Sequence, residues 1–164
     1  MILNLPPELL VQILSFLSLD DLILLERINK SLLMFIRNYP WNHFIVKLKD
    51  IDHIRYVVPK YQFQKYDFSH SDVTDDLILQ IGQCDTLLLH DCHQLRSPLI
   101  ETYNQCRILN LSQCHLDCTK RIVFDRPEVI YLIECPELAF YLSSRARIVK
   151  YPKQLTAEDA LYHQ

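Results

Sequence analysis

Cysteine and histidine are neighbours at two places in the middle of this chain. Cys92-His93 is followed 22 residues later by Cys114-His115, and Cys118 lies three residues beyond. Thiolate and imidazole are the donors of structural zinc sites, so such pairs are candidate metal ligands. A neighbouring thiol and imidazole can also act as nucleophile and base, and Cys118 with His115 is the candidate pair for that chemistry.

The positions of the cysteines disfavour both kinds of site. Cys92, Cys114 and Cys135 recur at one place of an internal repeat, so their side chains should point into a core, one repeat apart, instead of converging on one ion. Acyl transfer also needs an oxyanion site and an orienting third group, and no segment marks either. We therefore expect no metal, no cofactor and no catalytic residue. A zinc protein or a Cys/His hydrolase is the less favoured alternative.

The repeat begins at Phe63 and has five copies. Apolar residues occupy the fourth and sixth places of every copy, and cysteine occupies the ninth place of three. The fourth places, which are 21, 22, 21 and 19 residues apart, are Tyr66, Leu87, Leu109, Ile130 and Val149. Places four and six of a short parallel strand point to one side, here the core. Cysteine, a small apolar side chain, can be buried where the chain turns.

The remaining ten or so residues of each copy should return on the convex side as a helix or loop, with helices at 75–81 and 97–103. This pattern resembles the cysteine-containing leucine-rich repeat over residues 63 to about 154. The resemblance implies an α/β solenoid with a ladder of parallel strands. Its curvature would create a concave strand face for binding.

Places three, five and seven of each copy should line that concave face. The side chains expected there are unusually apolar, and exposed apolar patches tend to mark partner-binding surfaces. We predict that this face binds a target protein through Leu88, His90, Ile108, Asn110, Val129, Tyr131 and Ile133. The alternative is that residues 154–164 fold over it.

The first 45 residues have helical spacing instead. We expect helices at 4–17, at 22–28 and from Asn29 or Ser31 to Asn38, with Pro6 and Pro7 in the first turn. Ser18 or Asp20 should cap the second helix. The apolar stripe of so small a bundle is wider than the bundle can bury, so another surface should cover part of it.

One motif in this bundle resembles the F-box: Leu5-Pro6-x-Glu8-Leu9-Leu10-x-x-Ile13-x-x-x-Leu17, then Asp21-Leu22-x-x-Leu25, Lys30 and Trp41. The resemblance implies the non-catalytic, substrate-recruiting subunit of a Skp–cullin–F-box ubiquitin ligase. By the family pattern the residues that bind the Skp adaptor would be Leu5, Pro6, Leu9, Leu10, Ile13, Leu17, Leu22 and Leu25. The alternative is a leucine-rich-repeat interaction module without a ubiquitin role, whose bundle is only a cap.

The expected organisation has four parts. Residues 1–45 form the F-box bundle, 46–62 a connecting strand and helix, 63–154 the five repeats, and 155–164 a tail. A first edge strand at 44–48 and a return helix at 51–58 would leave no flexible linker. The bundle would then cap the open end of the solenoid, as stacked repeats require.

Composition excludes several classes of function. The net charge of −3 argues against a nucleic-acid partner, and a single glycine, Gly82, excludes the glycine-rich loops that cradle phosphates. The most apolar window, 9–19, is too short to span a bilayer, and the N-terminus does not read as a secretory signal. The six cysteines are then expected to be reduced thiols in cytoplasm or nucleus.

Overall fold

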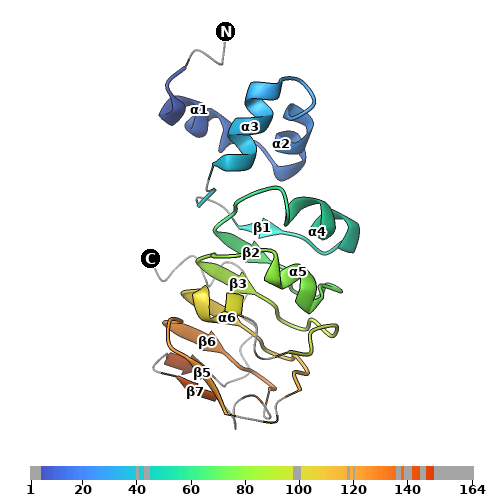
Figure 1. The fold of residues 1–164 in the computed structure, drawn as a ribbon, viewed down its shortest axis with the longest axis vertical. Helices are drawn as coiled ribbons and strands as arrows, with labels where there is room; N and C mark the ends of the chain where they lie inside the picture. Colours follow the sequence, from blue (N-terminus) through green and yellow to red (C-terminus); the bar gives the residue numbers. More distant parts are fainter. Residues whose placement is uncertain are drawn as a thin grey trace.

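The computed structural model describes residues 5–39, 41–42, 45–97, 101–117, 119, 121–135, 138, 142–144 and 147–149. Three short helices form the N-terminal bundle: α1 (Pro7–Leu14), α2 (Leu19–Leu25) and α3 (Lys30–Asn38) (Figure 1). The Ser18 hydroxyl accepts a hydrogen bond from the Asp21 N–H and so caps α2, which therefore begins three residues earlier than expected. The Asn29 side chain caps α3.

A parallel sheet of six strands follows the bundle. Its order is β1-β2-β3-β4-β6-β8, so each new strand is added to the same edge (Figure 1). The strands are β1 (Val46–Lys47), β2 (Lys65–Asp67), β3 (Thr86–Leu88), β4 (Ile108–Asn110), β6 (Val129–Tyr131) and β8 (Arg147–Val149). The predicted fold class, a helical bundle followed by an α/β array with a parallel ladder, is confirmed.

The register of the ladder follows the sequence repeat in all copies but the last. Tyr66 pairs with Leu87, Leu87 with Leu109, and Leu109 with Ile130. In the fifth copy, however, Ile130 pairs with Ile148 and not with the predicted Val149. The expected alignment was wrong by one residue there. Because Ile148 and Val149 are both apolar and β-branched, their types could not fix the register.

The segments that return between the strands of the six-stranded sheet change from helices to strands along the array. Helices α4 (Ile51–Val57), α5 (Asp75–Leu79) and α6 (Glu101–Gln105) are followed by β5 (Ile122–Phe124) and β7 (Leu142–Ser144), which form a second parallel sheet. The expectation of a helix or loop is wrong for these last two. In β5, Ile122 and Phe124 are buried while Val123 between them is half-exposed, the alternation of a one-sided strand.

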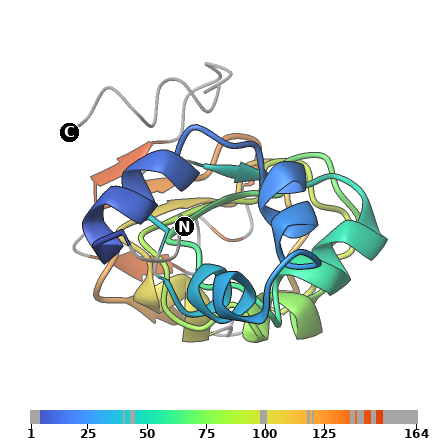
Figure 2. The same ribbon diagram turned by 90° about the horizontal axis from the view of Figure 1, so that it is seen from above.

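Trp41 joins the bundle to the array. Its side chain is fully buried, and its indole Nε1 donates a 2.8 Å hydrogen bond to the Ile36 carbonyl of α3. Its backbone N–H donates to the Gln62 carbonyl, and the Gln64 N–H donates to the Trp41 carbonyl. One continuous apolar core therefore runs from the bundle into the sheet. Figure 2 shows the bundle helices lying over the end of the array, the place expected of a cap.

Among the described residues, none of the helices is long and apolar enough to cross a bilayer.

Candidate functional site

Helix α1 has one apolar side in solvent and one in the core. Leu9 is 46% exposed, Ile13 41% and Phe16, just past the helix end, 88%. A spacing of four and three residues places these side chains on one side of α1. Leu10 and Leu14 point into the core instead.

The rest of the bundle adds three more exposed apolar side chains, Leu24, Ile28 and Met34. Of the nine large apolar side chains that are exposed among the described residues, six belong to this bundle. We use the name bundle face for all the exposed large apolar side chains of the bundle, on whichever helix they lie: Leu9, Ile13, Phe16, Leu24, Ile28 and Met34. Single exposed apolar residues are ordinary, but such a concentration in about 30 residues indicates a surface for another protein.

The eight residues predicted to bind the adaptor differ in how far their side chains are exposed to solvent. Leu9, Ile13 and Pro6 are exposed, and Leu5, Leu17 and Leu25 are partly buried. Leu10 and Leu22 are buried in the bundle's own core, so they shape the face but do not offer side chains to a partner. Adaptor binding by these residues stays a prediction.

The eight predicted adaptor-binding residues did not include the other four members of the bundle face. Their signal was helical spacing: Phe16 is three residues after Ile13, and Ile28 is four after Leu24. The exposure of Leu24 and Met34 could be recognised only in the structure, because this segment has many apolar residues and any of them could have filled the core.

The predicted target-binding patch is mostly buried. Leu88, Ile108, Asn110, Tyr131 and Ile133 are all at most 9% exposed, and only His90 and Val129 of the seven are partly exposed. The expectation of an open apolar patch was therefore wrong for five residues. Parallel strands lie about 4.8 Å apart, so each side chain in the middle of the ladder has a neighbour on both sides. Ile108, for example, lies between Thr86 and Val129.

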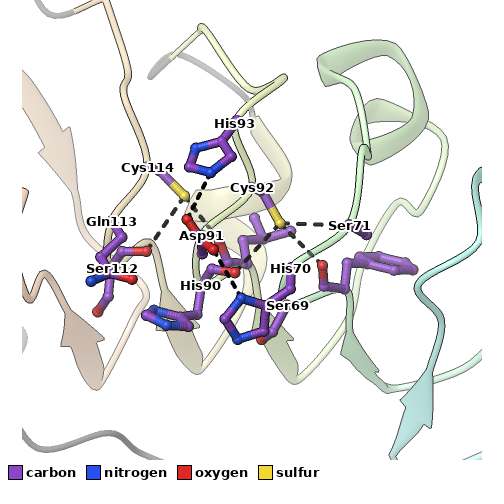
Figure 3. A network of polar contacts seen from close by, with 12 residues as sticks. Ser69, His70, Ser71, His90, Asp91, Cys92, His93, Ser112, Gln113 and Cys114 are labelled. Atoms are coloured by element: carbon purple, nitrogen blue, oxygen red, sulfur yellow. Dashed lines mark hydrogen bonds and ion pairs between the residues drawn. The ribbon is translucent and has the colours of Figure 1, made fainter.

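A polar rim follows the ends of the strands (Figure 3). His70 Nδ1 and His93 Nε2 each lie 2.9 Å from Asp91, on different carboxylate oxygens. The His90 ring meets His70 edge-on, with 4.8 Å between centroids. The hydrogen bond from His70 lowers the pKa of Asp91, so this carboxylate is charged at neutral pH.

The rim does not have the geometry of a metal centre. Its two paired imidazoles bind opposite oxygens of Asp91 and do not point at one common position. Among the residues that the structure describes, no group of three or more His, Cys, Asp or Glu side chains could hold a metal ion. Cys118 of the proposed Cys–His pair lies outside the described residues, and His115 is exposed, with its ring stacked 6.1 Å from His93.

Acidification should weaken the fold through His90. Burial, and then the neighbouring His70, lower the pKa of His90 below its ordinary value of 6.5. The unfolded chain therefore binds a proton more readily, and the stability that neutral His90 contributes is lost as the pH falls through and below 6.5. We expect a loss of less than about 1 kcal/mol between pH 7.5 and 5.5, since the site is partly solvated. The free energy of unfolding, measured by urea denaturation, should fall less between pH 7.5 and 5.5 in His90→Gln than in the unaltered chain. An equal fall in both chains would contradict the assignment.

The cysteines are structural. Each ninth-place thiol donates to the carbonyl of the residue that follows the strand of the preceding copy: Cys92 Sγ to Phe68 O at 3.1 Å, Cys114 Sγ to Leu89 O at 2.9 Å, and Cys135 Sγ to Leu111 O at 3.1 Å. Burial raises the pKa of Cys92 from its ordinary 9.0 to about 11. A thiol of this kind is a poor nucleophile.

The five described cysteines should therefore resist alkylation in the folded chain. At pH 7.5 a rise in the pKa from 9.0 to about 11 lowers the thiolate fraction of Cys92 roughly 100-fold, and burial adds to this protection. Timed iodoacetamide labelling with peptide mass spectrometry should show slow reaction in buffer and fast reaction in urea. Fast native labelling of Cys92 or Cys114 would restore the thiol-nucleophile hypothesis.

Comparison with known proteins identifies the bundle. Residues 2–46 match the model of the F-box-like family. The N-terminal bundle is an F-box-like domain. Domains of this family generally serve as non-catalytic adaptors that bind Skp in ubiquitin ligases. No curated protein and no solved structure matches the chain.

The family match covers a little over a quarter of the 164 residues and ends at Val46, the first residue of β1, so it leaves out nearly all of the parallel array. The resemblance of the array to leucine-rich repeats therefore depends on its own features. These are the strand ladder, the repeat length and the buried cysteines.

Proposed function

We propose that this chain is the substrate-recognition subunit of a Skp–cullin–F-box ubiquitin ligase. The observation that carries the proposal is the exposed side of α1 in an F-box-like domain, where Leu9, Ile13 and Phe16 lie in solvent. Covering these side chains would remove apolar surface from water, at about 25 cal/mol per Å². The Skp adaptor is the partner that this family implies.

The array is proposed to be a short leucine-rich-repeat solenoid that holds the target protein. From Val46, successive paired residues are 20, 21, 22, 21 and 18 residues apart, a regular solenoid step. The partly exposed His90 and Val129 are the accessible members of the concave set, and the other five would take part only if the face opens. The rim beside His90 offers the target hydrogen-bonding groups.

In this role the chain performs no covalent chemistry. It binds the adaptor at one end and a target at the other, which raises the effective concentration of a target lysine beside the ubiquitin-conjugating enzyme.

A native pull-down with mass spectrometry tests the proposal. Tagged full-length chain should retain the Skp adaptor and, through it, a cullin, and a chain with an altered bundle face should retain neither. The control is that other ligases of this class stay assembled under the same conditions. If the chain then retains partners that depend on the array but neither adaptor nor cullin, the result would favour an interaction module without a ubiquitin role.

A further inference from the structure

The bundle buries a charged side chain, Glu26, at the end of α2. This side chain is only 4% exposed, and glutamate is rarely buried without a partner. Arg37 of α3 supplies one in a bidentate pair, with Nε 2.9 Å from Oε1 and Nη2 3.1 Å from Oε2. Burial opposes the ionised form most strongly, but the hydrogen bond and charge of Arg37, together with the Tyr61 and Tyr56 hydroxyls, outweigh it and hold the pKa of Glu26 below its ordinary value.

The same carboxylate also reaches the array. The Tyr56 hydroxyl of α4 donates to Glu26 Oε2 at 3.3 Å. The Lys60 ammonium lies 3.2 Å from the centroid of the Tyr56 ring, so this ring is held from a second direction. Burial, and then the Glu26 carboxylate, raise the pKa of the neighbouring Tyr61, which keeps a second hydroxyl of the array protonated beside Glu26.

This ion pair joins the buried Glu26 to Arg37, whose side chain is 32% exposed, and it would be a poor device for stability alone. Desolvation offsets much of the attraction in a buried pair, and apolar side chains of similar size are often as stabilising. The pair differs from apolar packing in being directional, because the carboxylate must face Arg37 and Tyr56 together. The other contacts of the joint, the packed Trp41 ring and its hydrogen bonds to Ile36 and residues 62–64, tie α3 to the start of β2. The Glu26 contacts instead tie α2 and α3 to α4.

We propose that Glu26 is a positioning residue that locks the F-box-like bundle at one angle on the array through Arg37 and Tyr56. Its purpose rests on the proposed function, since a fixed angle holds a bound target at a fixed separation from the adaptor. The locking itself does not depend on that function. It can be measured in the free chain.

The measurement is a distance distribution between two spin labels. Ser31→Cys on α3 and Asp76→Cys on α5 place the labels on exposed positions of the bundle and the array. A Cys118→Ser background removes the one cysteine outside the described residues, and the other five are buried. The full-length chain is used throughout.

Two variants break the lock and one serves as a matched control. Glu26→Gln keeps the shape but removes the charge, and Tyr56→Phe removes only the hydroxyl that reaches Glu26. Asp52→Asn removes a carboxylate from the exposed 3.4 Å pair with Arg55 on the same helix as Tyr56.

The unaltered chain and Asp52→Asn should give one narrow distribution, and the two lock variants a distribution at least about twice as wide, with a cooperative melt retained. A purely structural Glu26 would lower the melting temperature and leave the distribution narrow, which would overturn the proposal. If Glu26→Gln does not fold, Tyr56→Phe decides, because it deletes a single oxygen. Failure of the chain to bind the adaptor would overturn the proposed function, but the distances would still decide the lock.

Discussion

Replacing Leu9 and Ile13 together by aspartate is expected to abolish adaptor binding and leave the fold intact. Both side chains are exposed in the free chain, so the charges stay hydrated there. In the complex each carboxylate would be buried against an apolar surface, at a cost of about 2 kcal/mol or more. Two such losses raise the dissociation constant at least about 1000-fold. Titration calorimetry with purified Skp adaptor measures this directly.

The control for this pair is Leu79→Asp. Leu79 is a half-exposed leucine on α5 of the array, so the change is chemically the same but lies outside the bundle face. It should leave the affinity within about twofold, since surface changes away from an interface have small effects. An affinity that stays within tenfold of the unaltered value in the folded Leu9/Ile13 double variant would show that α1 is not the docking surface.

Trp41→Ala should cause the largest loss of stability of any single change in this chain. The indole is fully buried, donates to the Ile36 carbonyl and meets Tyr39 edge-on at 5.0 Å. Its removal leaves a cavity where bundle and array share a core, at a cost of about 3–5 kcal/mol. A domain of this size has only about 5–15 kcal/mol in total. Urea denaturation followed by circular dichroism is the measurement.

The same experiment shows whether bundle and array unfold together. One continuous core predicts a single transition in the unaltered chain. The free energy of unfolding of Trp41→Phe, which keeps an aromatic ring but loses the indole hydrogen bond, should lie between those of the unaltered chain and Trp41→Ala. Two separate transitions in the unaltered chain, or a loss below about 1 kcal/mol in Trp41→Ala, would contradict the shared core.

The sequence was informative where residue type fixes geometry. Ser18 and Asn29 are caps because their side chains reach unpaired backbone N–H groups, and the ladder through Tyr66, Leu87 and Leu109 follows from apolar alternation at a constant step. The F-box motif was readable because its positions lie in one uninterrupted segment.

Other features depend on three-dimensional neighbours. The turns of four successive copies contain residues with φ between 56° and 60°, His70, Asp91, Gln113 and Glu134, where a glycine would have marked the turn in the sequence. The Asp91–imidazole contacts follow from stacking those turns. In the same way, spacing could not show that Leu10 and Leu22 are sealed in the core while Leu9 stays exposed, because this depends on how three helices cross.

The bundle face, as we interpret it, is an incomplete core that a second polypeptide covers. Hydroxyl-radical footprinting of the full chain, with and without saturating Skp adaptor, reads out side-chain exposure residue by residue. We expect oxidation of Phe16 and Met34 to slow at least about fivefold in the complex, while Leu79 and Val123 of the array keep their rates. Unchanged rates at Phe16 and Met34 in a chain saturated with adaptor would contradict this interpretation.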